Sequence, residues 1–517
     1  MRKSKYKFIL LLSLFLITIW FIDVPANERV GSAGMVVSAH PVASELGIEI
    51  LKSGGNAIDA AVAAALVIGV VEPNGSGLGG GGAMLVYLHK PDSLTYINYY
   101  VSAPASIAQD FNSRRESGSA RSVLVPGTVA GLYHALKKYG TMTWQELLNR
   151  VIQKVENGFT VGENFYQAIL ESYEKLLQQS ETRSIYFVND LPPEIGTRLK
   201  NLMLLQTLKK LAYEGPEVFY RGEIADSIES VMIREGGTLR KSDLMSYRVR
   251  ELQPLKGTYR GYEIVSAPPA QSGMTLIEAL NIFEMKDLNK MGDYTVSPQT
   301  FHFMAETFKR AYSDRTQYLC DPKFVDVPVD ILISKEFAKS RYLTINMEKV
   351  ESIPPDQKPA GDVTPFQKKP NSELEDPKGS TTHISVIDAD GNAVSLTQTL
   401  NYFWGSGISV CGFLLNNGMT SFSGSNEAIN QAAPGKQPRT TIAPTMLFEN
   451  GKLFMVIGSP GAGRIISTLA EVISNVIDFK MAADSANNAP RFYSRRWGEK
   501  LPIENRFSDD FQNKLKS

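Results

Sequence analysis

The alternation of apolar and polar residues predicts two helices and a strand near the start of the chain. Residues 42–56, "VASELGIEILKSGGN", carry apolar side chains at helical spacing and end at Gly54-Gly55. Residues 57–73, "AIDAAVAAALVIGVVEP", are apolar on nearly every face, which predicts a buried helix. The glycine run "GSGLGGGG" then leads into a predicted strand at residues 83–88, "AMLVYL".

The rest of the chain alternates between helical and strand patterns. Residues 120–350 are mostly helical, and residues 381–475 return to strand alternation and glycine turns. Residues 350–380 contain six prolines among Lys, Asp, Glu and Gln, which predicts a flexible linker with too little apolar content to fold onto a core. Strands at both ends with helices between them favour an α/β (α+β) layered domain whose sheets combine distant segments.

The strongest hairpin signal surrounds Asp390-Gly391, with "THISVID" before it and "NAVSLTQT" after it. A two-residue loop at Asp390-Gly391 places Thr399 opposite Thr382 and beside Thr381, with Asn401 just past the strand end. Hydroxyl groups and an amide therefore converge on Thr381. Threonine is common in strands, so a purely structural hairpin is the ordinary explanation.

The position of the linker favours a catalytic explanation instead. The linker ends at Ser380, so the Ser380–Thr381 bond lies on an accessible segment. A threonine with a free α-amine carries its own nucleophile and its own base. The reference pKa of an α-amine is about 7.7–8.0, so that amine accepts a proton near neutrality. We therefore predict self-cleavage between Ser380 and Thr381.

Composition excludes several other classes of protein. The 517 residues contain 54 Lys+Arg and 54 Asp+Glu, so no nucleic-acid partner is expected. Gly75, Gly77 and Gly80 match G-x-G-x-x-G, but the order helix, loop, strand is wrong for a dinucleotide site. That loop either packs closely on other backbone or forms the wall of a cleft. No G-x-S-x-G is present, and five scattered histidines predict no metal site.

The N-terminus has the pattern of a targeting segment. Four basic residues precede an uncharged apolar run at residues 8–22, which is short for a membrane span and typical of a signal peptide within residues 1–30. A retained signal-anchor is the alternative. In either case we expect an exported protein, extracellular, at the cell surface or periplasmic. Cys320 and Cys411 are too few for a disulfide framework, although such a compartment permits a bridge.

Several motifs resemble one family in its own order. They are "VSAHPVASELGIEILKSGGNAIDAAVA", "SGLGGGGAML", "SVLVPGTVAGLYHALKKYGTMTW", "SAPPAQSGMTLIEALNIFE", "HFMAETFKRAYSDRTQYLCDP", "GSTTHISVIDADGNAVSLTQTLN", "FLLNNGM", "RTTIAPTM", "IGSPGAGRI" and "NNAPRF". Together they resemble the γ-glutamyltransferases (glutathione hydrolases), which are N-terminal-nucleophile hydrolases. The resemblance implies a four-layer αββα sandwich whose central sheets are shared by two subunits of one precursor. These would be a large subunit, residues 31–380, and a small subunit, residues 381–517, that form a heterodimer.

The resemblance also implies roles for individual residues. Thr381 would be the nucleophile for self-cleavage and for attack on a γ-glutamyl amide, and Thr399 would hydrogen-bond to it. The backbone amides of Gly461 and Ala462 would form the oxyanion hole, a role that survives the replacement of a usual glycine by Ala462. Substrate-binding residues implied by the same motifs are Asn401, Thr440 and Thr441.

The chain departs from the family pattern at the donor site. Tyr100 and Val101, in "NYYVSAP", occupy the positions of a usual Arg that binds the donor carboxylate. Ser421, in "NNGMTSF", stands where an Asp usually binds the α-ammonium group. A charge-assisted hydrogen bond contributes about 1.5–3 kcal/mol, so each loss corresponds to roughly 10- to 100-fold in donor binding. Arg439 and Arg464 are candidates to supply the missing positive charge.

A third departure is that 25 residues follow "NAPRF", where the family usually continues through a strand pair, so an open sheet edge is expected. The function expected from these features is a self-processing γ-glutamyl hydrolase/transferase without a cofactor. Its donor would be glutathione or a related small molecule, and water, an amino acid or a peptide would accept the acyl group. The alternatives are a poly-γ-glutamate depolymerase/transferase and a catalytically impaired surface binding protein.

Overall fold

The structure is a computed structural model that describes residues 31, 33–108, 110–350, 360–363, 380–424 and 428–516. The predicted signal peptide or signal-anchor at residues 1–30 and most of the predicted linker lie outside these residues. Within the described ranges no helix is long and apolar enough to cross a membrane.

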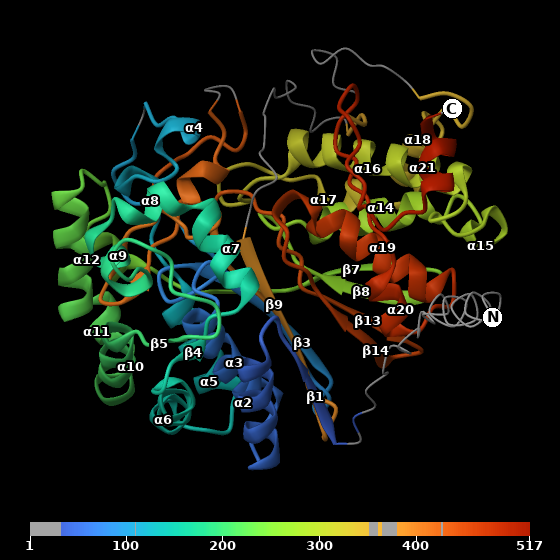
Figure 1. Cartoon of the computed structure of the whole chain (residues 1–517). Helices are drawn as coiled ribbons and strands as arrows, with labels where there is room; N and C mark the ends of the chain where they lie inside the picture. The colour runs from blue at the N-terminus through green and yellow to red at the C-terminus, as the bar shows by residue number, and fades with distance from the viewer. Residues whose placement is uncertain are drawn as a thin grey trace, which may run out of the picture.

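Two antiparallel sheets form the centre of the molecule (Figure 1). The first has the order β1-β9-β10-β2-β3-β6, with β1 Gly34–Val37, β9 Ser380–Asp388, β10 Ala393–Asn401, β2 Gly81–Leu88, β3 Ser93–Tyr99 and β6 Arg250–Leu252. The second has the order β14-β13-β8-β7, with β14 Lys452–Ile457, β13 Thr445–Glu449, β8 Tyr262–Ser266 and β7 Leu255–Tyr259. Two short pairs, β4 Phe159–Thr160 with β5 Arg198–Leu199 and β11 Ser409–Val410 with β12 Phe413–Leu414, complete the strands.

Helices cover the outer face of the first sheet. Here α3 (Ala57–Val71) is buried on almost every side, as its composition predicts, and a capping box at Asn56 and Asp59 fixes its start. Ile384 and Val386 of β9 point toward this layer and share its core. The other helices on this side of the molecule are α2 Pro41–Lys52, α4 Ser113–Glu116, α5 Thr128–Tyr139, α6 Trp144–Val155, α7 Glu163–Glu171, α8 Tyr173–Leu177, α9 Ser180–Tyr186, α10 Leu202–Glu214, α11 Glu217–Tyr220, α12 Glu223–Arg234 and α13 Lys241–Ser246.

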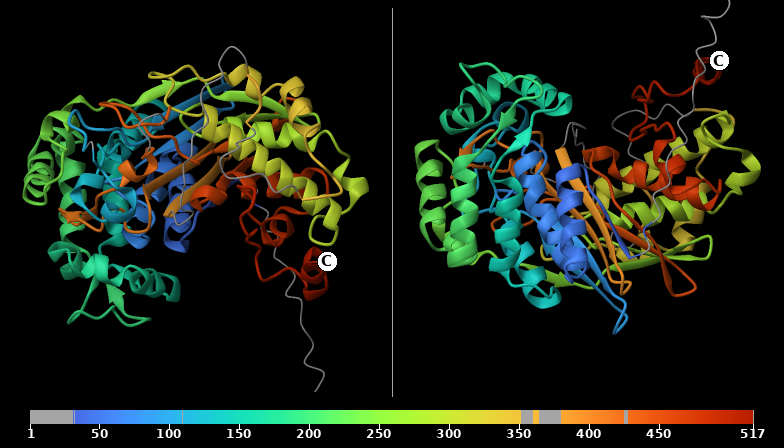
Figure 2. Two further views of the ribbon diagram at one scale, coloured as in Figure 1. Left: turned by 90° about the horizontal axis from the view of Figure 1, so that it is seen from above. Right: turned by 60° about the horizontal axis from the view of Figure 1, so that its bottom comes forward.

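A second group of helices covers the second sheet. Its main members, α14 (Gly273–Phe283), α16 (Pro298–Tyr318) and α19 (Ile465–Ile477), share one apolar core with β8 and β13. The smaller helices of this part are α15 Leu288–Met291, α17 Val329–Leu332, α18 Lys335–Tyr342, α20 Ala483–Asn488 and α21 Asp509–Lys516. Figure 2 shows both groups of helices outside the strands.

The predicted αββα sandwich is therefore confirmed. Residues on both sides of the predicted cleavage point build each sheet, since β9 and β10 lie between β1 and β2, and β13 pairs with β8. The two edge strands of the second sheet are β14 and β7. Cleavage before Thr381 would leave two chains held together by both sheets.

The hairpin loop differs from the prediction. Ala393 pairs with Ile387 and the Asp388 N–H donates to the Asn392 carbonyl (3.0 Å), which leaves three loop residues rather than two. Gly391 lies at φ +83°, the left-handed position that a three-residue hairpin loop requires. The Asp388 carboxylate also accepts from the backbone N–H groups of Asp390 and Asn392, so it closes the longer loop. The observed pairing is therefore shifted by one residue from the prediction along most of the hairpin, so that Gln398 rather than Thr399 pairs with Thr382.

The predicted linker also needs a correction. Its residues 360–363, "AGDV", lie against the helices that cover the second sheet, and Val363 is buried there in one cluster with Phe337. The Gly361 N–H donates to Asp314 Oδ1 (2.6 Å), and the Tyr318 hydroxyl donates to the Gly361 carbonyl (2.6 Å). One apolar residue and a glycine are thus enough to attach this segment, although its composition is that of a linker.

The glycine run packs closely on other backbone, the first of the two explanations given for it. A Cβ on Gly79 would lie 2.2 Å from the Leu414 carbonyl oxygen, and one on Gly80 would lie 2.4 Å from that of Thr399. The absent side chains let the loop pass behind the end of β10. Its role is to support the strand that carries Thr399.

Candidate active site

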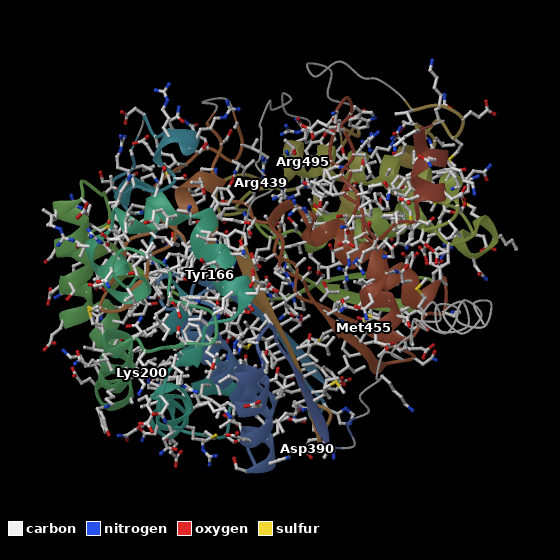
Figure 3. The ribbon with its side chains drawn as sticks, viewed as in Figure 1. Tyr166, Lys200, Asp390, Arg439, Met455 and Arg495 are labelled. Carbon is white, nitrogen blue, oxygen red and sulfur yellow. The ribbon has the colours of Figure 1, made fainter. Side chains whose placement is uncertain are left out.

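A pocket of about 70 Å³ opens where β9 begins. Figure 3 places Arg439 near this end of β9 and Asp390 at the opposite end. The pocket brings together most of the residues singled out from the sequence. Its lining consists of Tyr100, Arg315, Thr381, Thr399, Asn401, Tyr402, Thr420, Ser421, Arg439, Thr440, Thr441, Ile442, Ala462 and Gly463.

Thr381 and Thr399 meet at this end of the hairpin. The Thr381 hydroxyl donates to Thr399 Oγ1 at 3.2 Å, and Thr399 Oγ1 also accepts from the Asn401 backbone N–H at 2.8 Å. Thr381 is half-buried, whereas Thr399 is buried. The predicted contact between the two hydroxyl groups is present, although the hairpin register differs.

An irregularity in β10 creates this contact. Gln398 pairs with Thr382, but Asn401 pairs with Ser380, so one extra residue is accommodated between them. Asn401 adopts φ +82°, a conformation that Asn tolerates better than most residues. Asn401 is the last residue of β10 rather than the first beyond it.

Three neutral side chains lie together in the pocket lining. Asn401 Nδ2 donates to the Tyr100 hydroxyl and to Ser421 Oγ, both at 2.9 Å. The two positions that lack the family's charged residues, Tyr100 and Ser421, are thus joined through Asn401. Val101, beside Tyr100, is fully buried and packs near Gly418 rather than in the pocket.

Tyr100 is rigidly held and uncharged. Its N–H donates to Asn98 Oδ1 (2.9 Å), and its carbonyl accepts from the Tyr247 hydroxyl (2.9 Å). Burial raises the pKa of the Tyr100 hydroxyl, and hydrogen bonds with Thr440, Asn401 and Ser421 oppose this only in part. The phenol therefore stays protonated at neutral pH.

Asn401 retains one unused hydrogen-bond acceptor. Its Oδ1 atom is buried and has no partner among the described residues. A buried amide oxygen without a partner costs about 1–3 kcal/mol, so a ligand N–H at this position would be favoured. The geometry fits the predicted role of Asn401 in donor binding.

The two threonines predicted from "RTTIAPTM" line the same pocket, and Thr440 hydrogen-bonds with the Tyr100 hydroxyl. The Thr440 N–H donates to the Ala270 carbonyl (3.0 Å), and the Thr440 carbonyl accepts from the Ser272 hydroxyl (2.6 Å). Ser272 Oγ accepts in turn from Arg315 Nε (2.9 Å). These contacts fix the backbone so that Thr440 and Thr441 line the pocket.

The predicted oxyanion turn lies beside the same pocket. Gly461 (φ +125°) and Ala462 (φ +50°) both have left-handed backbone conformations, and a short 3-10 helix follows at Ala462–Arg464. Neither N–H donates to any described residue, which leaves both available for a ligand oxygen. Ala462 lines the pocket itself, whereas Gly461 lines a neighbouring cavity.

The two arginines proposed from the sequence have different positions. Arg439 is buried and lines the pocket, where its Nη1 donates to the Thr316 carbonyl at 2.9 Å. Arg464 is exposed and lines the neighbouring cavity, so it is not among the residues that line the pocket around Thr381. The expectation for Arg464 is wrong.

Arg315 is the main site residue that the sequence analysis missed. It lies on α16, 2% exposed, among the apolar residues Ala311 and Tyr312 that face the core. A charged residue on the buried face of a helix is the signal that could have identified it. Four further lining residues were also missed, namely Tyr402, Thr420, Ile442 and Gly463.

The described residues include no cluster of acidic, histidine or cysteine side chains that could hold a metal ion. Cys320 and Cys411 are free thiols and form no bridge.

Comparison with known proteins identifies the family. Residues 43–517 match the family model described as gamma-glutamyltranspeptidase. The glutathione hydrolase proenzyme of Escherichia coli is 36% identical over 500 residues, which cover 92% of this chain and 83% of the relative. The capsule biosynthesis protein CapD proenzyme of Bacillus anthracis is 34% identical, with 88% of this chain and 78% of the relative covered.

A crystal structure of cephalosporin acylase from Bacillus halodurans has the same fold, with a TM-score of 0.83 and 27% identity over 95% of this chain and 90% of that one. The fold and the site define an N-terminal-nucleophile hydrolase. The chain belongs to the gamma-glutamyltranspeptidase family. Members of this family are enzymes, and the relatives named above are described as proenzymes.

Proposed function

We propose that this chain is a self-processing γ-glutamyl hydrolase/transferase that uses Thr381 as its nucleophile. The observation that carries the proposal is the Thr381–Thr399 hydroxyl contact in the pocket that Ala462 also lines. Gly461 precedes Ala462 and lines the neighbouring cavity, and neither of their N–H groups donates to a described residue. These are the three parts that acyl transfer through a threonine requires: a nucleophile, a group that orients it and oxyanion donors.

Processing and turnover then use the same hydroxyl. In processing, Thr381 Oγ1 attacks the Ser380 carbonyl, the peptide C–N bond breaks, and the ester formed is hydrolysed by water to give a free α-amine on Thr381. In turnover, that amine takes the hydroxyl proton while Oγ1 attacks the γ-carbonyl of the donor. The proton passes to the leaving amine, and water or an acceptor amine then releases the glutamyl group from the ester.

The intact mass of purified protein incubated at neutral pH tests the first step. We expect two fragments from the wild type, the smaller one beginning at Thr381, and one uncut chain from Thr381→Ala. Hydrolysis of γ-glutamyl-p-nitroanilide by the cleaved protein tests the second step. A single uncut wild-type chain that is not labelled by a γ-glutamyl affinity reagent would instead support the surface binding protein.

A polymeric donor such as poly-γ-glutamate is the second candidate. The side chains of Tyr100, Asn401 and Ser421 are neutral, and no carboxylate is among the described residues that line the pocket. Inside a polymer the α-nitrogen is an amide rather than an ammonium group, so it needs one acceptor, such as Asn401 Oδ1, and no carboxylate. Release of glutamate oligomers from the polymer, with glutathione left intact, would favour this candidate.

Two further proposals concern the form of the protein in the cell. Residues 1–30 would direct export, and the two products of cleavage would remain together as a heterodimer, because strands from both sides of Thr381 share each sheet. Mass analysis of secreted and cell-bound protein tests whether residues 1–30 are removed. Size-exclusion chromatography after cleavage tests whether the two subunits elute together.

A further inference from the structure

A column of polar side chains lies on the face of β9 and β10 that is turned toward the second sheet. On β9 its members alternate with the core residues, as strand geometry requires, and they face polar partners on β10. The column consists of Thr381, His383 and Ser385 on β9 and Ser395, Thr397 and Thr399 on β10. Thr381 stands at one end, so the column begins at the nucleophile.

His383 joins the middle of this column. Its Nδ1 atom lies 2.9 Å from Thr397 Oγ1, and its Nε2 atom lies 2.9 Å from Ser385 Oγ. The Ser385 hydroxyl donates to the Val456 carbonyl at 3.3 Å, so it accepts from Nε2–H. Nδ1 is then the acceptor for the Thr397 hydroxyl. Burial lowers the pKa of His383 to about 3, and a neutral imidazole is what this chain of hydrogen bonds needs.

The column ends on the strand that leads into the oxyanion turn. Val456 and Ile457 are the last residues of β14, and both of their carbonyls are held from the first sheet. Ser385 donates to Val456, and Ser395 Oγ donates to the Ile457 carbonyl at 3.0 Å. Gly458 follows immediately, three residues before Gly461.

Gly458 rests on the imidazole of His383. A Cβ added to Gly458 would lie 2.1 Å from both Cε1 and Nδ1 of His383, so no side chain fits between them. The other side of the turn is open, because Gly458, Ser459, Pro460 and Gly461 line a cavity of about 620 Å³. Support for the turn therefore comes from the His383 side.

We infer that His383 is a positioning residue, which sets the oxyanion turn at Gly458–Gly461 relative to Thr381 through its hydrogen bonds and its contact with Gly458. The inference rests on the proposed function, since it assigns the turn its role in acyl transfer. His383 is not among the residues that line the pocket, and its hydrogen bonds go to Thr397 and Ser385, so we assign it an action through the turn and not as an acid or a base.

The first test compares kinetic constants of cleaved enzyme. We expect His383→Phe, which keeps a ring but loses both hydrogen bonds, to lower kcat for γ-glutamyl-p-nitroanilide about 10- to 100-fold while KM changes less than about twofold, because a displaced oxyanion donor weakens only transition-state binding. His383→Gln has an amide that can still donate to Ser385. Its decrease in log kcat should therefore be smaller than that of His383→Phe by at least about a third. His302→Phe, a change to a histidine on the outer surface of α16, is the matched control and should leave kcat unchanged.

The second test does not need turnover. Gly458→Ala leaves the histidine side chain unchanged but places a methyl group against its imidazole, which forces the turn away from His383. A crystal structure of this variant and of His383→Phe should show the Gly458–Gly461 backbone displaced while β9 and β10 stay in place. If His383→Phe does not fold, Gly458→Ala still tests the inference through its kcat and through the position of the turn in its crystal structure.

The outcomes separate this inference from the proposed function. A wild type that neither cleaves itself nor turns over the anilide would refute the proposed function, and the displaced turn in the crystal structures would still support the positioning role. Normal kcat in His383→Phe and Gly458→Ala, or a turn that stays in place in both, would overturn the inference. A fall in kcat matched by an equal fall in the fraction of sites titrated by an affinity reagent would overturn it as well, since that result indicates loss of folded protein.

Discussion

Thr399→Val is the most direct perturbation of the proposed nucleophile. Valine has nearly the same shape as threonine, so the packing at the end of β10 is kept and only the hydroxyl is lost. That hydroxyl accepts from Thr381 Oγ1 at 3.2 Å and from the Asn401 N–H at 2.8 Å. The substitution therefore removes the group that orients the nucleophile and leaves a buried N–H without its partner.

The two losses affect different measurements. A neutral hydrogen bond contributes about 0.5–1.5 kcal/mol, which corresponds to roughly a 2- to 13-fold slower cleavage when orientation of Thr381 is lost. An unsatisfied buried N–H costs about 1–3 kcal/mol, and this should lower the free energy of unfolding. Thr399→Ser keeps the oxygen, so its cleavage rate should stay within about twofold of the wild-type rate. Its free energy of unfolding should also stay close to that of the wild type.

The assay follows the uncut precursor with time by intact mass, in parallel with denaturant unfolding of each variant. Precursor is best isolated at low temperature, so that the cleavage rate constant is read directly. Thr399→Val that cleaves as fast as the wild type would refute the idea that Thr399 orients Thr381. A slow Thr399→Ser with the stability of the wild type would point to the methyl group rather than the hydroxyl.

Three other substitutions test the pocket and the residue that supports its oxyanion turn. Ser421→Asp adds a carboxylate beside Asn401. We expect the ratio of kcat/KM for γ-glutamyl-p-nitroanilide to kcat/KM for the glutaryl anilide, which lacks the α-ammonium group, to rise about 10- to 100-fold. An unchanged ratio would contradict this. The pKa of His383 is about 3 in the folded protein and 6.5 in the unfolded chain. Its contribution to stability is therefore complete above pH 6.5 and falls by about 3 kcal/mol between pH 7 and 4. In denaturant titrations, His383→Asn should lose about 3 kcal/mol less than the wild type over this pH range, and an equal loss would contradict the prediction. Ala462→Gly should raise the free energy of unfolding by about 1 kcal/mol by relieving the left-handed alanine, with kcat kept within about twofold because the N–H remains; a large loss of kcat would assign a role to the methyl group.

The residue patterns predicted a layered α/β domain and the convergence on Thr381, because both depend on local chemistry, whereas the four-layer sandwich was implied by the family resemblance. Alternation placed the core residues of β9 on one face, and the Asp-Gly pair marked the hairpin. The loop was nevertheless one residue longer than predicted, since the Asp388 carboxylate closes it through two N–H groups. The extra residue before Asn401 then compensates for this shift, and neither irregularity has a signature in the sequence.

The parts of the site that come from the second sheet were harder to predict. Arg315 reaches the pocket from α16 because of the way two helical layers are packed, and helical periodicity describes only which face is buried. The attachment of Val363 depends on an apolar cluster to which α14, α16, α17 and α18 contribute, and no local pattern within the linker reveals this cluster. In both cases the missing information is tertiary: a surface formed by residues distant in the sequence.

Asn401 connects the two functions of the pocket and explains why this residue type stands there. Its backbone N–H binds Thr399, which orients the nucleophile, and its side-chain amide binds Tyr100 and Ser421 and leaves Oδ1 for the donor. Both uses require φ near +82°, where Asn is more easily accommodated than Gln or a β-branched residue. Asp would keep the backbone conformation but lose the amide that donates to Tyr100, and Gly would lose the side chain. Under the proposed function, self-cleavage uses the backbone group and donor recognition uses the side chain, so the neutral residues at Tyr100 and Ser421 would change the donor without changing how Thr381 is oriented.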